Sequence, residues 1–185
     1  MNIAEPQHRA PPAVMHMMGN LIPDDRVLNA LHNSRMVENL SGPEIEILVS
    51  LITAQYFETK EFIVELDDEP LKSSLMILVE GKIEVSALID NQPVSLQLET
   101  PGDLARIISF VGGNTMSVRA RIKIKKDSTV LLLQRSKLET LLHSHPSIVY
   151  GVMKNLVRHV HGVARRKNAE MEEMSNYLNR TNGLY

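Results

Sequence analysis

The sequence contains no cysteine and no tryptophan, and aromatic residues make up only 4% of its 185 residues. The absence of cysteine excludes disulfides, thiolate metal sites and cysteine nucleophiles, and it fits a reducing compartment. The scarcity of aromatic residues argues against a stacking surface for single-stranded nucleic acid. The net charge of −2 gives no overall attraction to nucleic acid or to an acidic membrane.

Long apolar runs are also missing. No stretch approaches the roughly 18 residues that span a bilayer, and the N-terminus lacks the basic and apolar segments of a secretory signal. We therefore expect a cytoplasmic protein with no membrane contact. Residues 1–20 carry three prolines and a methionine-rich patch without a stable period, which predicts a flexible tail. The alternative is that this patch docks on a partner, because methionine adapts to irregular surfaces.

Helical spacing of apolar residues predicts helices between Pro23 and Tyr56. Ser41, followed by proline in the first turn and by Glu44 three residues later, predicts the start of the second helix through a capping box. After a predicted short helix capped by Ser136, His145-Pro146 ends the segment. One long helix is then predicted from Ser147 to about Asn179.

From Phe57 to Leu133 the apolar period changes to two, which is typical of strands. A continuous apolar strand ends at Gly81, and Asp90-Asn91 predicts a hairpin tip. The short strands and turns predict an α+β, mainly β fold: an antiparallel β-roll (jelly roll) with N-terminal helices and a long C-terminal dimerisation helix. The predicted units are the tail 1–20, the roll with its flanking helices 21–145, and the long helix 146–185.

The long helix carries a heptad repeat whose apolar seam is interrupted only by Lys167. A helix of this length gains little from one small β-domain, so its free half is expected to pair with a second copy of the chain. The alternative is a helix packed wholly on its own roll. The residues predicted to form the dimer contact are Tyr150, Met153, Val157, Val160, Ala164, Met171, Met174 and Leu178.

Five local sequences carry a resemblance to a known family. Ile77–Val85 resembles a strand pair around a fixed glycine, and Pro101–Leu104 resembles a "Pro-Gly-Asp" turn. Val118–Ala120 with Asp127–Leu131 resembles the return strands, and Arg135–Leu142 resembles the helix before the dimerisation helix. Together they resemble the cyclic-nucleotide-binding domain of the catabolite-activator family of regulators, from about Val27 to Arg166. The resemblance implies a β-roll that binds a cyclic nucleotide in a cassette after the turn. In that cassette a glycine admits the phosphate, a glutamate accepts a bond from the ribose, and an arginine pairs with the phosphate.

The chain departs from the family pattern within this cassette. Arg106 stands at the glycine and Ile107 at the glutamate, and the stretch Asn114–Ser117 contains no cation where the arginine belongs. A cyclic phosphate without that cation loses a charge-assisted bond worth roughly 1.5–3 kcal/mol. We therefore predict a degenerate pocket and do not expect cyclic AMP or cyclic GMP binding in the family manner. The residues expected to contact any ligand are Gly81, Gly102, Arg106, Ile107, Ile108, Ser109, Thr115, Met116, Ser117 and Arg119.

Alternating basic residues occupy one predicted strand: Arg119, Arg121, Lys123 and Lys125. They are expected to form a solvated sheet face, paired across strands with Glu84 or Glu99, and the alternative is a surface for an acidic partner. Few residues remain after Tyr177, where the family's regulators continue into a helix-turn-helix, so sequence-specific DNA binding is not expected. Nor do the residues predict a metal site or a cofactor.

Two hypotheses for function follow. The first is a non-enzymatic regulatory or signalling module that forms a homodimer and acts by binding another protein. The second is a sensor that binds a small ligand, such as a cyclic nucleotide or cyclic dinucleotide, in a remodelled pocket. No nucleophile–base pair or paired carboxylates support an enzyme. The two hypotheses differ at the pocket, because a scaffold fills it with apolar side chains and a sensor leaves a cavity lined by at least one cation.

Overall fold

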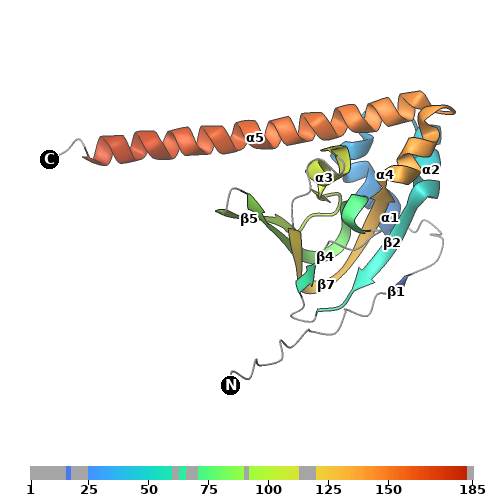
Figure 1. Cartoon of the computed structure of the whole chain (residues 1–185), viewed down its shortest axis with the longest axis horizontal. Coiled ribbons are helices and arrows are strands. Elements are labelled where there is room, and N and C mark those ends of the chain that lie inside the picture. Colours follow the sequence, from blue (N-terminus) through green and yellow to red (C-terminus); the bar gives the residue numbers. More distant parts are fainter. Residues whose placement is uncertain are drawn as a thin grey trace, which may run out of the picture.

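The computed structural model describes residues 16–17, 25–59, 63–65, 71–89, 92–112 and 120–182. Short helices precede the roll and a long helix follows it, as the sequence predicted, whereas a short helix at residues 107–112, within the segment predicted as strands, was not predicted (Figure 1). The helical elements are α1 (Asp25–Asn33), η1 (Arg35–Val37), α2 (Gly42–Leu51), η2 (Leu71–Ser73), α3 (Ile107–Gly112), α4 (Arg135–Glu139), η4 (Thr140–Leu142) and α5 (Pro146–Asn182). The strands are β1 (His16–Met17), β2 (Ile52–Phe57), β3 (Ile63–Glu65), β4 (Ser74–Ile89), β5 (Gln92–Leu98), β6 (Leu104–Ala105) and β7 (Ala120–Gln134).

Two long, bent strands, β4 and β7, organise the roll. All the strand pairs are antiparallel, and β4 lies between β7 and β5 in the order β1-β2-β7-β4-β5. The first half of β4 also pairs with β6, and the first half of β7 also pairs with β3. Each long strand therefore takes part in both halves of the curved sheet, which closes it into the predicted roll.

The apolar run at the start of β4 is buried on both of its faces. Leu75, Ile77 and Val79 pack in a core shared with the helices, whereas Met76 and Leu78 point into a second core inside the roll. A strand covered on both faces needs apolar residues at every position, not at alternate ones. This arrangement explains why the sequence shows a continuous run here.

Gly81 lies where β4 bends away from the first half of the sheet. The register between β4 and β7 shifts between Leu78 and Ile83, and Gly81 has a φ of +105°. The backbone of Ser128 on β7 passes so close that a Cβ on Gly81 would lie 2.6 Å from Ser128 Cα. Ser128 Oγ accepts a hydrogen bond of 3.0 Å from Lys82 N beside this contact. Glycine is therefore required here for both its backbone conformation and the close approach of the strands.

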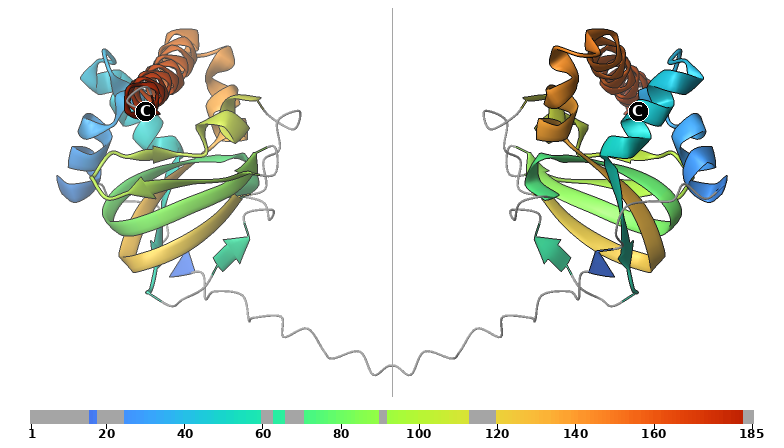
Figure 2. Two further views of the ribbon diagram at one scale, coloured as in Figure 1. Left: turned by 90° about the vertical axis from the view of Figure 1, so that its left-hand side faces the viewer. Right: turned by 90° about the vertical axis from the view of Figure 1, so that its right-hand side faces the viewer.

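The predicted helix start at Ser41 is confirmed. Ser41 N donates to Glu44 Oε2 at 2.9 Å, and Ser41 Oγ donates to the same oxygen at 2.8 Å. Both bonds lower the pKa of Glu44 because they stabilise its carboxylate, and the bond from the backbone N–H has the larger effect. The short helices and the start of α5 gather on one side of the roll, and the C-terminal half of α5 extends beyond it (Figures 1 and 2).

Some predicted boundaries were wrong. Residues 52–56, predicted as helical, form β2, because pairing with Leu133–Thr129 of β7 outweighs the helical spacing. The strands predicted on either side of Gly81 are one bulged strand, and those on either side of Ser128 are one strand, β7. The short helix before α5 begins at Arg135, so Ser136 lies inside it and does not cap it.

Other predictions are tested only in part or not at all. Within the predicted N-terminal tail, the two described residues His16–Met17 pair with β2, and the rest of the tail lies outside the described residues. The predicted hairpin tip at Asp90-Asn91 also lies outside them, but Ile89 pairs with Gln92 as a hairpin requires. None of the described helices is long and apolar enough to cross a membrane.

The basic face of β7 is partly neutralised across the sheet. Lys125 Nζ lies 2.7 Å from Glu84 Oε2, and this is one of the cross-strand pairs that the sequence predicted. The contact lowers the pKa of Glu84 because it stabilises the carboxylate. Glu99 instead pairs with Lys82, at 2.6 Å between Nζ and Oε1. In the strand register, Lys123 lies opposite Glu84 of β4 and Arg121 lies opposite Glu65 of β3.

Candidate functional site

A cavity of about 540 Å³ lies between the roll and α5. The roll contributes the ends of β4 and β5, the turn before β6, and the start of α3, while α5 contributes two turns of helix. The residues that line it are Val85, Leu96, Gln97, Leu98, Asp103, Leu104, Ala105, Arg106, Ile107, Ile108, Ser109, His159, Val160, Val163, Ala164 and Arg166. Its size lies within the range of about 300–1,000 Å³ that is typical of small-molecule sites.

The turn before β6 contributes Asp103 to the lining of the cavity. Asp103 Oδ2 accepts hydrogen bonds from the backbone N–H groups of Glu99 and Thr100, both at 2.9 Å. Gly102, with a φ of +95°, approaches the end of α1 so closely that a Cβ would lie 2.8 Å from Asn33 C. The "Pro-Gly-Asp" sequence is therefore explained by turn geometry and packing alone.

Arg106 has a backbone conformation that favours glycine. Its φ is +67°, in the left-handed region, and its carbonyl accepts a 3.0 Å bond from Phe110 N at the start of α3. The family resemblance predicted a glycine at this position. The conformation matches that expectation, but the side chain here adds a half-buried cation to the cavity wall.

Ile107 stands where the resemblance places the glutamate that accepts a ribose hydroxyl. Its side chain is 8% exposed and belongs to the core shared with the helices. An isoleucine side chain cannot accept a hydrogen bond, so the side chain of Ile107 offers no acceptor to a ribose hydroxyl.

The charged groups of the cavity are predominantly basic. The lining includes two arginines, Arg106 and the exposed Arg166, and one carboxylate, Asp103, whose Oδ2 accepts two backbone hydrogen bonds. The pKa of His159 is lowered, first by burial and then by Arg166 and Arg35, while Asp103 opposes the shift. His159 is therefore held neutral at neutral pH and does not act as a third cation.

The structure brings together some of the predicted ligand residues. Arg106, Ile107, Ile108 and Ser109 line the cavity, whereas Gly81 and Gly102 are not among its lining residues. The predicted residues Thr115, Met116, Ser117 and Arg119 lie outside the described residues. The sequence analysis missed the walls formed by β5 and α5. Val160 and Ala164 were assigned only to the dimer seam, and nothing local to α5 indicates that it faces β5.

The first half of α5 has two different faces. Ile148, Val152 and Leu156 are completely buried against the helical core. Tyr150, Val157 and Met171 of the predicted seam are 68%, 55% and 70% exposed. Ala164 is also exposed, Met153 and Val160 are half-buried, and the side chains of Met174 and Leu178 are not described.

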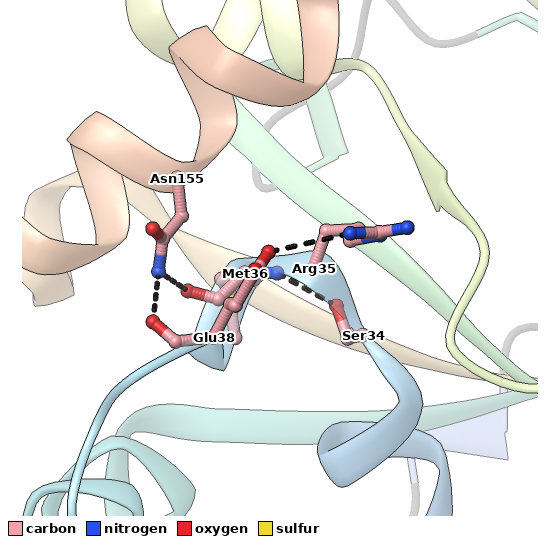
Figure 3. Close-up of polar contacts among 5 residues, drawn as sticks. All are labelled: Ser34, Arg35, Met36, Glu38 and Asn155. Atoms are coloured by element: carbon pink, nitrogen blue, oxygen red, sulfur yellow. Dashed lines mark hydrogen bonds and ion pairs between the residues drawn. The ribbon is translucent and has the colours of Figure 1, made fainter. Parts of the chain in front are cut away.

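A buried asparagine fixes α5 to the N-terminal helices. Asn155 is 5% exposed, and its Nδ2 donates to Met36 O at 3.1 Å and to Glu38 O at 2.7 Å (Figure 3). Ser34 Oγ accepts a bond from Met36 N within the same turn. Asn155 therefore satisfies two backbone carbonyls at the end of η1 and sets the position of α5 against the roll. Among the described residues, no three His, Asp or Glu side chains gather as a metal site.

Comparison with known proteins gives structural neighbours only, because no family model and no curated protein matches the sequence. A cyclic nucleotide-binding domain from Methylobacillus flagellatus is 17% identical, with a TM-score of 0.63 over 80% of this chain and 82% of that one. The Thermus thermophilus catabolite activator protein is 21% identical, with a TM-score of 0.57 over 77% and 63%. The regulatory subunit of a cAMP-independent protein kinase A from Trypanosoma brucei is 18% identical, with a TM-score of 0.54 over 80% and 49%.

These similarities establish the fold. The chain has the architecture of a cyclic-nucleotide-binding domain, an antiparallel roll flanked by helices and followed by a long helix, as the sequence resemblance predicted. Identities of 17–21% carry no ligand or activity from these proteins to this chain.

Proposed function

We propose that this chain is a non-enzymatic, cytoplasmic regulatory module that pairs with a second copy through α5 and acts by contacting another protein. The observation that carries the proposal is the apolar seam on the outer face of α5. Tyr150, Val157 and Met171 expose most of their surface in the single chain. Apolar side chains aligned at heptad spacing gain stability when a second helix covers them.

The course of α5 supports pairing. Its inner face buries Val152 and Leu156 against the core, and the seam residues Met153 and Val160 pack beside them. The seam residues that are turned away from the core are Tyr150, Val157 and Met171. The C-terminal half of the helix extends past the roll (Figure 1). A solitary helix that projects into water has little to stabilise it, whereas a partner helix supplies the missing contacts.

Substitution of Met171 by glutamate tests this pairing. Each dimer would then place two carboxylates in the seam and lose the burial of two methionines, so the dimer dissociation constant is expected to rise roughly 1000-fold or more. Analytical ultracentrifugation over a range of protein concentrations measures this constant.

Ala169→Glu is the matched control. Ala169 is exposed two residues earlier on α5, and a separation of two residues turns the side chain to the opposite side of the helix. The control is expected to remain dimeric with the affinity of the original chain. A monomeric original chain, or equal weakening by the two substitutions, contradicts pairing through this seam.

The described cassette supports a module that does not respond to cyclic AMP or cyclic GMP. Ile107 offers no acceptor for the ribose, and Arg106 takes the place of the glycine that admits the phosphate. The trypanosome protein, which shares the fold, is described as the regulatory subunit of a cAMP-independent protein kinase A. A triply substituted form of that subunit is described as bound to cAMP.

A small-ligand sensor is the second candidate function. The cavity favours it, because a scaffold was expected to fill the pocket with apolar side chains and a sensor to leave a cavity lined by a cation. A cavity of about 540 Å³ that has Arg106 among its lining residues supports this second candidate. Protein contact through α5 and ligand binding at this cavity are compatible in one molecule, since α5 takes part in both.

A further inference from the structure

The walls of the cavity expose apolar surface that nothing in the described chain covers. Leu96 on β5 and Ile108 on α3 are 47% and 46% exposed, and both line the cavity. Val160 and Val163 of α5 form the opposite wall. Removing this surface from water contributes roughly 25 cal/mol per Å², so an apolar molecule that fills the space is stabilised from both sides.

The polar groups of the cavity favour an anion. Two arginines, the half-buried Arg106 and the exposed Arg166, are among the lining residues, against the single carboxylate of Asp103. Nε and Nη1 of Arg106 are shielded from solvent within the cavity wall. That carboxylate accepts two backbone hydrogen bonds, and the neighbouring His159 stays neutral at neutral pH because burial and Arg166 lower its pKa. A ligand carboxylate placed among these groups gains charge-assisted bonds from arginine.

We propose that the cavity binds an amphipathic organic anion, with an apolar body between β5 and α5 and one anionic group held by Arg106 and, at the mouth, by Arg166. The lining is mainly apolar, and its polar side chains other than the charged ones are Gln97, Ser109 and His159, so a nucleoside would leave several of its ribose and base polar groups against Leu, Ile and Val side chains. Each buried polar group without a partner costs roughly a tenfold loss of affinity or more. This inference does not depend on pairing through α5.

Decanoate and decanol are the probes for the full-length protein. They share an apolar chain, but only decanoate carries a carboxylate, so the comparison isolates the anionic group. Decanoate is expected to raise the melting temperature and to bind at least tenfold more tightly than decanol in isothermal titration calorimetry. Cyclic AMP, measured in the same way, is expected to bind more weakly than decanoate.

Substitutions of the two arginines locate the binding site. Arg106→Gly is expected to weaken decanoate binding by roughly 10- to 100-fold and to leave decanol binding unchanged. The fold tolerates this change because glycine adopts the φ of +67° without strain. Arg106→Lys is expected to retain part of the affinity, and Arg166→Ala to lose a smaller part. Arg158→Ala, on an exposed part of α5 that does not line the cavity, is the control and should have no effect.

Equal binding of decanoate and decanol overturns the proposal, as does a decanoate affinity that Arg106→Gly leaves unchanged. Tighter binding of cyclic AMP than of decanoate overturns it in favour of a nucleotide sensor. Absence of any binding to the folded protein overturns it as well. Sedimentation of the same samples tests dimerisation separately. A dimer that does not bind decanoate contradicts the ligand inference and leaves the proposed function standing.

Discussion

Replacement of Gly81 by alanine is expected to lower the free energy of unfolding by roughly 3–5 kcal/mol, from backbone strain and steric overlap together. A residue with a side chain is strained at the observed φ of +105°. The new Cβ would also overlap Ser128 Oγ and the Asp127 carbonyl oxygen, and it would lie 2.6 Å from Ser128 Cα. Urea unfolding monitored by circular dichroism measures the change.

Gly162→Ala is the control for this substitution. Gly162 lies inside α5 with no atom within 4 Å of an added Cβ. Alanine in a helix interior is more favourable than glycine by roughly 0.5–1 kcal/mol, so the control should be slightly more stable than the original chain. If Gly81→Ala costs no more than about 1 kcal/mol, the tight crossing of β4 and β7 is not as described.

Asn155→Ala is the second substitution with a large expected effect, a loss of roughly 2–4 kcal/mol of stability. The change removes the donor to Met36 O and Glu38 O, and it leaves two carbonyl groups without their bonds beside the completely buried Leu156. A buried acceptor without a partner costs roughly 1–3 kcal/mol. Hydrogen exchange should show faster opening of the turn at η1 and of the first half of α5.

Arg158→Ala, one turn away on the exposed side of α5, is the matched control for Asn155 and should change stability by less than about 0.5 kcal/mol. Equal effects of the two substitutions would contradict the anchoring role of Asn155. Asn155→Ala could also lower the global stability without changing the hydrogen exchange rates around η1. That result would show that the hydrogen bonds of Asn155 do not position α5 locally.

Local chemistry explains why part of the fold could be predicted from the sequence. The capping box at Ser41 and Glu44 predicts a helix start because both partners lie within one turn. The apolar run Leu75–Val79 predicts a buried strand because every position needs an apolar side chain. The helical assignment of residues 52–56 failed because the partner strand, residues 129–133 of β7, is far away in the chain.

The candidate site was harder to predict for a related reason. Arg106 and Ile107 could be placed by resemblance, and both line the cavity. The opposite wall comes from His159 to Arg166, more than fifty residues later, and depends on how Asn155 and its neighbours dock α5. Asn155 is a polar residue within an apolar stripe of α5. Its presence is explained by its hydrogen bonds to Met36 O and Glu38 O, which are distant in the sequence.

Thermal unfolding of the purified protein with and without about 1 mM cyclic AMP, cyclic GMP or cyclic di-GMP tests the central claim most directly. A ligand at about 100 times its dissociation constant stabilises the folded state by about 2.7 kcal/mol, which corresponds to roughly 5–10 °C for a chain of this size. We predict a shift below about 1 °C for all three nucleotides, because Ile107 and Arg106 occupy the places of the ribose acceptor and the phosphate-admitting glycine. A shift of several degrees with any of them would contradict the degenerate cassette and make the chain a cyclic-nucleotide sensor.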